Sequence, residues 1–155
     1  MLLISGSEVG RRVAQHTAVV HEQVPMAELT SFFARAFGAA MHVIRAQRAV
    51  PVGPPFGAYH GAPGETVDVE AGFPVATPVD DTEGVVSSTL PGGPAVEAVH
   101  IGPYDTMTGT YGEMEAWMAE QGVSPGPVMW ESYLTDPERE PDPSTWRTLI
   151  VWPIA

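Results

Sequence analysis

The feature that most constrains this chain is a succession of elements that occurs twice, once in each half of the sequence. In the first half, residues 13–24 are rich in β-branched side chains and predict a strand, which Pro25 ends. Apolar side chains then recur at steps of three and four residues from 26 to 48, which predicts a helix with one buried face. Shorter runs at 56–60 and 66–75 predict two antiparallel strands. The first half therefore has the predicted order strand, helix, strand, strand.

The second half repeats this order. Strand patterns at 85–90 and 95–101 flank the turn sequence PGGP, so this half begins with a strand or a pair of strands. A helical pattern follows at 105–121, and Gly122 supplies the left-handed residue that commonly ends a helix. Its methionines and Trp117 are expected to pack between helix and sheet. The last two strands are predicted at 127–134 and 146–154.

Matching short sequences support a duplication. Gly53-Pro54 precedes its strand as Gly126-Pro127 precedes the corresponding strand of the second half. Near the end of each half, Phe73-Pro74-Val75 matches Trp152-Pro153-Ile154. Two units that each leave one sheet face uncovered are expected to pair, and grooves at such junctions bind ligands.

We therefore predict an α+β fold made of duplicated βαββ halves with pseudo-twofold symmetry. It has antiparallel sheets, two helices and a central ligand cleft. The chain is predicted to be one domain, residues 1–155, with pseudo-repeats at about 11–76 and 85–155. The polar, acidic stretch 77–84 would connect the halves.

Composition excludes several classes of protein. Lysine and arginine number 7 and aspartate and glutamate 19, a formal net charge of −12, so we expect no direct contact with nucleic acid. The absence of cysteine excludes disulfides and thiolate metal sites and fits a cytoplasmic protein. The opening MLLISGSEVGRR is the reverse of a signal peptide, and no segment approaches the ~20 apolar residues of a membrane helix. We expect neither secretion nor membrane association.

Two other site types find no support in the sequence. The histidines show no metal-ligand spacing and there is no HExxH motif, so we expect no metal or other cofactor. Residues 122–126 match the GxSxG pattern of serine hydrolases. They lie between a helix and a strand instead of a strand and a helix, and Pro125 lacks the N–H that an oxyanion hole would use. A serine nucleophile is not expected.

Several motifs, in their order, resemble one known family. The second half carries VHIGPYDTMTGTYGEMEAWMAEQG, GPVMWESYLTDP and WRTLIVWPI, and the first half adds VGPPFGAYHG and VDVEAGFPV. These resemble the GyrI-like, or gyrase-inhibitor-like, small-molecule-binding domains. Such domains also occur as effector-binding domains of MerR- and AraC-type multidrug regulators. The resemblance covers the chain from about Val13 onward.

The resemblance implies a cleft for bulky, aromatic, often cationic compounds, with a strand glutamate at the position of Glu131. Some members of the family act as gyrase-binding inhibitors or as hydrolases of strained electrophilic natural products. The DNA-binding helix-turn-helix or MerR arm of the family's regulators has no counterpart in this sequence. We therefore expect a stand-alone module.

The candidate site centres on Glu131, in the segment MWESY. The strand period of two places Met129, Glu131 and Tyr133 on one face and the residues between them on the other. A carboxylate among apolar and aromatic groups loses hydration, so it suits either a cation or proton transfer. The alternative is an exposed glutamate that forms an ion pair with Arg147 across the hairpin.

Aromatic residues are expected around this glutamate. Tyr104, at the start of the second helix, and Trp146, at the start of the last strand, are the leading candidates for an aromatic wall. Core or rim packing is the alternative for each.

Residues of the first half are expected on the opposite wall, at the positions that correspond roughly to Met129, Ser132 and Tyr133. They are Phe56, Tyr59 and His60. For His60, the favoured interpretation is a partly exposed strand histidine without a role, and a hydrogen-bonding wall residue is the alternative.

Three functions follow from this site. The favoured one is capture of bulky aromatic, amphipathic or cationic compounds around Glu131. The first alternative is hydrolysis of reactive, cyclopropane-type electrophiles with Glu131 as acid or base. The second alternative is interaction with a protein partner, gyrase or a regulator, for which the acidic charge is the only sequence support.

Overall fold

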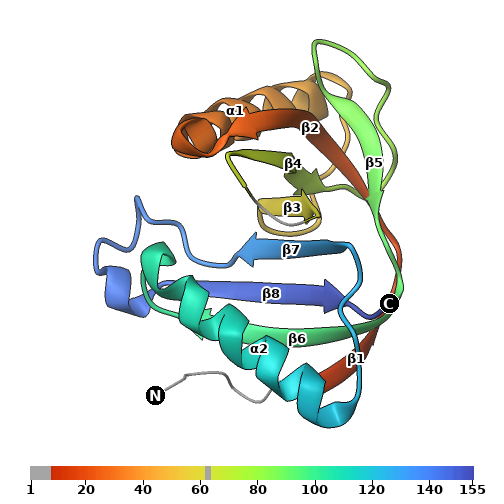
Figure 1. The fold of residues 1–155 in the computed structure, drawn as a ribbon. Helices are drawn as coiled ribbons and strands as arrows, with labels where there is room; N and C mark the ends of the chain where they lie inside the picture. Colours follow the sequence, from red (N-terminus) through yellow and green to blue (C-terminus); the bar gives the residue numbers. More distant parts are fainter. Residues whose placement is uncertain (1–7, 62–63) are drawn as a thin grey trace. The chain divides into compact units, whose positions relative to one another are not determined.

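The computed structural model describes residues 8–61 and 64–155, and these form two compact units. Val13–Gly92 form one, which we call the inserted unit. Residues 8–12 and 93–155 form the other, which we call the terminal unit. In each unit one helix lies against an antiparallel sheet (Figure 1). The apolar run that opens the sequence, residues 1–7, lies outside the described residues.

The inserted unit has four strands and one long helix. In chain order these are β2 (Gln15–Pro25), the short 3-10 turn η1 (Met26–Glu28), α1 (Leu29–Ala46), β3 (Phe56–His60), β4 (Thr66–Pro74) and β5 (Val86–Leu90). The strands lie side by side in the order β3-β4-β2-β5, and all neighbours are antiparallel. The predicted helix and strands of the first half are confirmed, except that the helix begins with the η1 turn.

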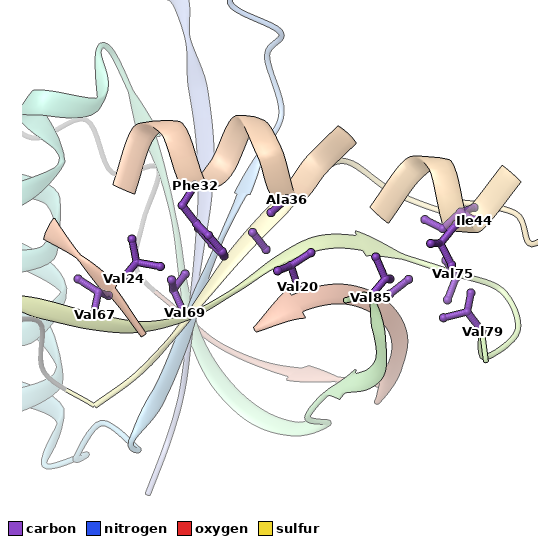
Figure 2. Close-up of a cluster of buried hydrophobic side chains, with 13 residues drawn as sticks. Val20, Val24, Phe32, Ala36, Ile44, Val67, Val69, Val75, Val79 and Val85 are labelled. Carbon is purple, nitrogen blue, oxygen red and sulfur yellow. The ribbon is translucent and has the colours of Figure 1, made fainter. Parts of the chain in front are cut away.

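One face of this sheet packs against α1 (Figure 2). Phe32, Ala36 and Ile44 lie on one side of the helix because they are four and eight residues apart, and all three are buried. Alternate residues of the strands, among them Val20 and Val69, meet them. Each fully buried large apolar side chain contributes about 1.5–3 kcal/mol, so this face holds the unit together.

The terminal unit is built in the same way. It contains β1 (Glu8–Arg12), β6 (Gly93–Ile101), the 3-10 turn η2 (Tyr104–Thr106), α2 (Met107–Gln121), β7 (Val128–Tyr133) and β8 (Arg147–Pro153). The sheet order is β1-β6-β8-β7, again antiparallel throughout. Gly122 ends α2 in the left-handed conformation, with φ 71°, as predicted. The methionines of α2 pack on this sheet, and Trp117 lies at the edge of that core.

The two sheets have equivalent strands in equivalent places, because β3-β4-β2-β5 corresponds to β7-β8-β6-β1. This confirms the α+β class and the duplicated βαββ arrangement. The pseudo-twofold axis, the central cleft and the single domain stay predictions.

The pairing of the outermost strand of each unit, β5 in the inserted unit and β1 in the terminal unit, was not predicted. The PGGP turn flanked by two strand patterns suggests that the neighbouring strands β5 and β6 belong together, yet β5 pairs with β2 in the inserted unit. Conversely β1, which was not predicted, pairs with β6 although it precedes β2 in the chain. Turn residues specify a change of chain direction but carry no information about which strands pair. Local sequence patterns therefore do not predict that β5 pairs with β2 and β1 with β6.

Candidate functional site

The Glu131 carboxyl group is held by two tyrosine hydroxyls within the terminal unit. Tyr133, two residues along β7, donates to Oε1 at 2.8 Å, and Tyr111, on α2, donates to Oε2. The residue is 8% exposed. A buried carboxyl needs such partners, because an unsatisfied buried polar group costs about 1–3 kcal/mol. The site thus joins α2 to β7 within the unit.

The strand period explains why Glu131 faces α2. The β7–β8 register sets Glu131 opposite Ile150, which belongs to the core beneath α2, and Met129 packs against the same core. Trp130 points to the other face, where the Arg12 guanidinium carbon lies 5.9 Å from its ring centre. The predicted division of faces in MWESY is therefore confirmed.

The alternative of an exposed Glu131 paired with Arg147 is wrong. Glu131 is buried, whereas Arg147 is exposed. Arg147 lies three residues before Ile150 on β8, and because side chains alternate along a strand it points to the face opposite Ile150 and Glu131.

Three aromatic rings lie together beside the carboxyl group, and we call them the aromatic wall: Tyr104, Tyr133 and Trp146. The Tyr104 ring centre is 5.7 Å from that of Tyr133, edge to face, and 5.0 Å from that of Trp146. Trp146 is fixed through its indole N–H, which donates to the Glu140 carbonyl oxygen at 2.8 Å. The structure thus brings together Glu131 and all three aromatic residues predicted for the second half.

The Tyr104 hydroxyl lies in an environment that changes its acidity. Burial, and then the negative charges of Glu131 and Asp136, raise the pKa of the Tyr104 hydroxyl above its ordinary value. A tyrosine hydroxyl is protonated at neutral pH, and the raised pKa keeps this one a hydrogen-bond donor to higher pH than usual. At 39% exposure, Tyr104 is also the most accessible large apolar surface of the wall.

A further polar group lies on the same sheet face. Thr148 of β8 is fully buried between Tyr133 of β7 and His100 of β6, which are its partners in the two ladders. Within the part of the chain that the structure describes, its hydroxyl has no hydrogen-bond partner.

The three residues predicted for the opposite wall lie in the inserted unit and do not share one face. Tyr59 packs against the core beneath α1, whereas Phe56 and His60 are at positions that point to the other face of the sheet. The Phe56 side chain is 1% exposed.

The expected correspondence between the halves is wrong by one residue. β4 and β8 both end in an aromatic residue followed by proline, and matching these ends makes Val69 equivalent to Thr148. Tyr59 pairs with Val69 and Tyr133 pairs with Thr148, so Tyr59 is the counterpart of Tyr133. The cause is a one-residue difference in the loop after the Gly-Pro pairs. When the alignment of two strands is shifted by one residue, every side chain is assigned to the wrong face of the sheet.

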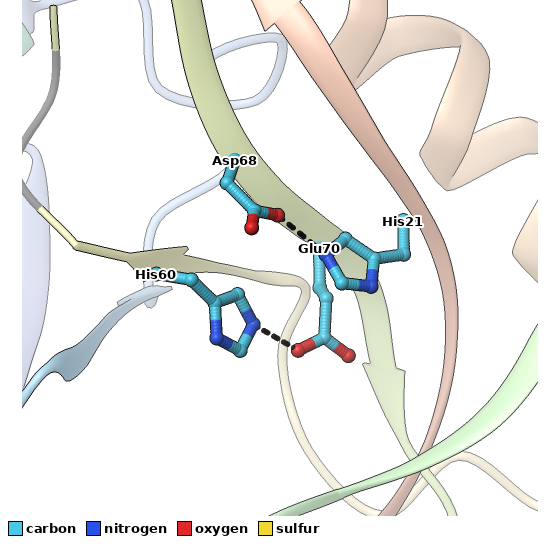
Figure 3. A network of polar contacts seen from close by, with 4 residues as sticks. All are labelled: His21, His60, Asp68 and Glu70. Atoms are coloured by element: carbon cyan, nitrogen blue, oxygen red, sulfur yellow. Dashed lines mark hydrogen bonds and ion pairs between the residues drawn. The ribbon is translucent and has the colours of Figure 1, made fainter.

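His60 belongs to a polar network on the sheet face away from α1 (Figure 3). Its Nε2 lies 2.5 Å from Glu70, and His21 Nε2 lies 2.5 Å from Asp68. The two imidazole rings stack with centres 5.1 Å apart. Glu70 is 8% exposed, so His60 supplies a polar partner for a buried carboxyl group. The part of His60 in a ligand wall stays a prediction.

Sequence reasoning missed Tyr111. Tyr111 lies in the helix predicted at 105–121 and packs against the core beneath α2, with its ring edge-to-face against that of Trp152 at 6.2 Å between ring centres. The available signal was the hydroxyl itself, because a tyrosine in a buried stripe usually needs a hydrogen-bond partner.

Two further observations bear on the kind of site. Among residues 8–61 and 64–155, no three histidine or acidic side chains are grouped so as to hold a metal ion. No helix of those residues has the length and apolar character needed to cross a membrane.

The fold and the buried carboxyl group with its aromatic neighbours place the chain among small α+β domains that bind small molecules. A family model described as the GyrI-like small molecule binding domain matches residues 11–155, and the chain belongs to that family. A comparison with curated proteins gave no match.

Solved structures share the fold. The C-terminal domain of EcmrR superposes with a TM-score of 0.85 at 20% identity, covering 99% of both chains. EcmrR in a DNA complex gives 0.84 at 21% identity, with 96% of this chain and 57% of that one covered, so this chain spans little more than half of that protein.

More distant structures include a hydrolase from Listeria innocua, with a TM-score of 0.64 at 15% identity over 96% of this chain and 91% of that one. Another is SAV2435 bound to tetraphenylphosphonium, with 0.67 at 10% identity over 97% and 94%. At these identities the likeness concerns the fold alone.

Proposed function

We propose that this domain captures bulky aromatic compounds, amphipathic or cationic, at the Glu131 site of the terminal unit. The observation that carries the proposal is a buried carboxyl group that two tyrosine hydroxyls hold beside the aromatic wall. Membership of a small-molecule-binding family supports it. The ligand of SAV2435, tetraphenylphosphonium, is an aromatic cation of this kind.

The chemistry of the site suits such a ligand. A cation beside Glu131 gains a counter-charge, and contact with the face of a tyrosine or tryptophan ring adds about 0.5–2 kcal/mol. The formal net charge of −12 raises the local concentration of cations and repels anions. We also propose a cytoplasmic setting and no direct binding of nucleic acid, on composition alone.

The test is calorimetric titration with tetraphenylphosphonium and with a rhodamine dye. Glu131→Gln should weaken binding at least tenfold, since it removes the counter-charge but keeps the side-chain shape. Glu120→Gln is the matched control, because Glu120 is an exposed residue of α2 and the change in net charge is the same. Equal affinities of the two variants would contradict the proposal.

The second candidate is a hydrolase of reactive electrophiles, and the hydroxyl-to-carboxyl contacts favour it. The Glu131 carboxylate can take a proton from a water that attacks the strained ring, while a Tyr111 or Tyr133 hydroxyl gives its proton to the carbonyl oxygen that receives the electron pair of the broken ring bond. Glu131 then returns the proton to the tyrosine, so the net reaction is addition of one water. The test is incubation with a cyclopropane-bearing alkylator and detection of the water adduct by mass spectrometry. An unchanged compound, or turnover that persists in Glu131→Gln, would exclude this reaction.

A third candidate, interaction with gyrase or a regulator, rests on the acidic charge and the family resemblance. Pull-down with purified gyrase tests it directly. Binding that survives in about 0.5 M salt would support a specific interface, because nonspecific charge attraction is screened there.

A further inference from the structure

His100 is a buried titratable residue next to the candidate site, and none of the functions above uses it. It lies on β6, 5% exposed, and its position on the strand points it toward α2. Its two ring nitrogens contact three oxygen atoms. Nδ1 lies 2.6 Å from the Thr110 hydroxyl, while Nε2 lies 3.1 Å from the Pro103 carbonyl oxygen and 3.0 Å from the Thr106 hydroxyl.

These contacts determine which nitrogen carries the proton. A carbonyl oxygen can only accept, so Nε2–H donates to Pro103. In the neutral ring Nδ1 then accepts from the Thr110 hydroxyl, and both nitrogens are satisfied. The Thr106 hydroxyl is already oriented, because it donates to the Pro103 carbonyl oxygen at 2.7 Å.

The segment that His100 holds is the turn that carries Tyr104. Gly102 enters this turn with φ 133°, a conformation that other residues rarely adopt, and its N–H donates to the Trp146 carbonyl oxygen at 2.8 Å. The Nε2 contacts to Pro103 and Thr106 lie on either side of Tyr104 in the sequence. The imidazole therefore fixes the backbone on both sides of the most exposed ring of the aromatic wall.

We propose that His100 is a positioning residue of the ligand site, which sets affinity by holding the 103–106 turn so that Tyr104 stays against Trp146 and Tyr133. His100 does not touch the ligand and acts through Tyr104. This inference rests on the proposed binding function for its effect on affinity. Its effect on the turn is independent of any ligand.

Two substitutions separate the two nitrogens. In His100→Gln, the terminal amide reaches about as far as Nε2 and can still donate to Pro103. In His100→Asn, the shorter amide reaches about as far as Nδ1 and leaves the turn without its donor. Thr110→Val is the control, because it removes the Nδ1 partner and leaves the contacts to the turn in place.

The first measurement needs no ligand. Amide exchange by NMR reports on Thr106, whose N–H donates to the Pro103 carbonyl oxygen, and the indole N–H signal of Trp146 reports on the neighbouring Tyr104 ring. His100→Asn should speed exchange at Thr106 and shift the Trp146 signal, whereas His100→Gln and Thr110→Val should change both much less. An unchanged turn in His100→Asn would overturn the inference.

The second measurement is tetraphenylphosphonium affinity in a double-variant cycle. His100→Asn should weaken binding about tenfold and His100→Gln less than about threefold. Because His100 acts through Tyr104, adding His100→Asn to Tyr104→Ala should cause no further loss. The inference would be overturned if the affinity losses of His100→Asn and Tyr104→Ala were additive. It would also be overturned if His100→Asn bound with full affinity although exchange at Thr106 was faster. In both cases the proposed binding function would stand. If the wild type binds no tetraphenylphosphonium, the proposed binding of this ligand fails, and the ligand-free measurement still decides whether His100 holds the turn.

Discussion

Two tyrosine hydroxyls, from different elements, determine how the Glu131 carboxyl group is held. Tyr133 lies two residues from Glu131, and the strand period predicts that they share a face. Tyr111 approaches from α2, across the space between helix and sheet. A contact of this second kind depends on the height and rotation of the helix over the sheet. The spacing of apolar residues encodes neither the height nor the rotation of the helix. The sequence therefore shows that the Tyr111 hydroxyl needs a partner, but not that the partner is Glu131.

Removal of the helix hydroxyl should destabilise the terminal unit. In Tyr111→Phe the ring packing stays but Oε2 of Glu131 loses this donor, so the unfolding free energy should fall by about 1–3 kcal/mol. Urea denaturation at neutral pH measures the change. Thr108→Ala, at an exposed position of the same helix, should change it by less than about 0.5 kcal/mol. A Tyr111→Phe protein as stable as the wild type would show that this hydrogen bond does not matter.

Tyr104 should make stability sensitive to alkaline pH. Its pKa is raised in the folded protein, so on raising the pH the unfolded chain loses this proton first. The contribution to stability is complete below the ordinary tyrosine value, about pH 10, and is lost as the pH rises through the folded value. Unfolding free energies measured from about pH 8 to 11 should therefore fall less steeply in Tyr104→Phe than in the wild type. Parallel curves would argue against the assigned environment.

At the scale of helices and strands, local patterns located the elements but not their partners. The run Phe56–His60 was predicted with the bounds that β3 has, because Gly-Pro before it and glycine after it delimit a short β-forming segment. The partner of β5 was not predictable, since β5 pairs with β2 across most of the inserted unit. The segment from Gly126 to Tyr133 is one residue longer than the segment from Gly53 to Tyr59, so the equivalence of Tyr59 and Tyr133 was not predicted either.

Two glycines that look alike in sequence should respond oppositely to alanine. At Gly38, exposed in α1, an added Cβ meets nothing within 4 Å, so Gly38→Ala should stabilise the protein by about 1 kcal/mol through helix propensity. At Gly72 of β4, a Cβ would overlap the backbone of Ala18 and Val19 on β2, and Gly72→Ala should cost more than about 2 kcal/mol. Thermal unfolding distinguishes the two. A stable Gly72→Ala protein would contradict the close approach of β2 and β4.

At the scale of the whole molecule, the chain leaves the terminal unit after β1, forms the complete inserted unit and then returns. Of the two units, the terminal unit alone combines two separate stretches of the described chain. They are joined by the pairing of β1 with β6 and by the ion pair of Arg12 with Glu97 at 2.9 Å.

Deletion of residues 1–12 tests this organisation. Hydrogen exchange should accelerate in β6, which loses its partner strand, while β2 and β4 of the inserted unit keep their protection. The Glu97→Gln protein, with β1 present, controls for loss of the ion pair alone. Equal loss of protection in both units would show that they unfold as one.

If the proposed function is right, Glu131 selects ligands by their charge. The most direct measurement compares two probes of nearly equal size and shape, the cation tetraphenylphosphonium and the anion tetraphenylborate, by titration against wild type and Glu131→Gln. The wild type should prefer the cation by at least about a hundredfold, and Glu131→Gln should reduce that preference by at least about tenfold, with Glu120→Gln unchanged. A preference that is the same in wild type and Glu131→Gln would contradict the claim, because selection would then come from the net charge of the protein.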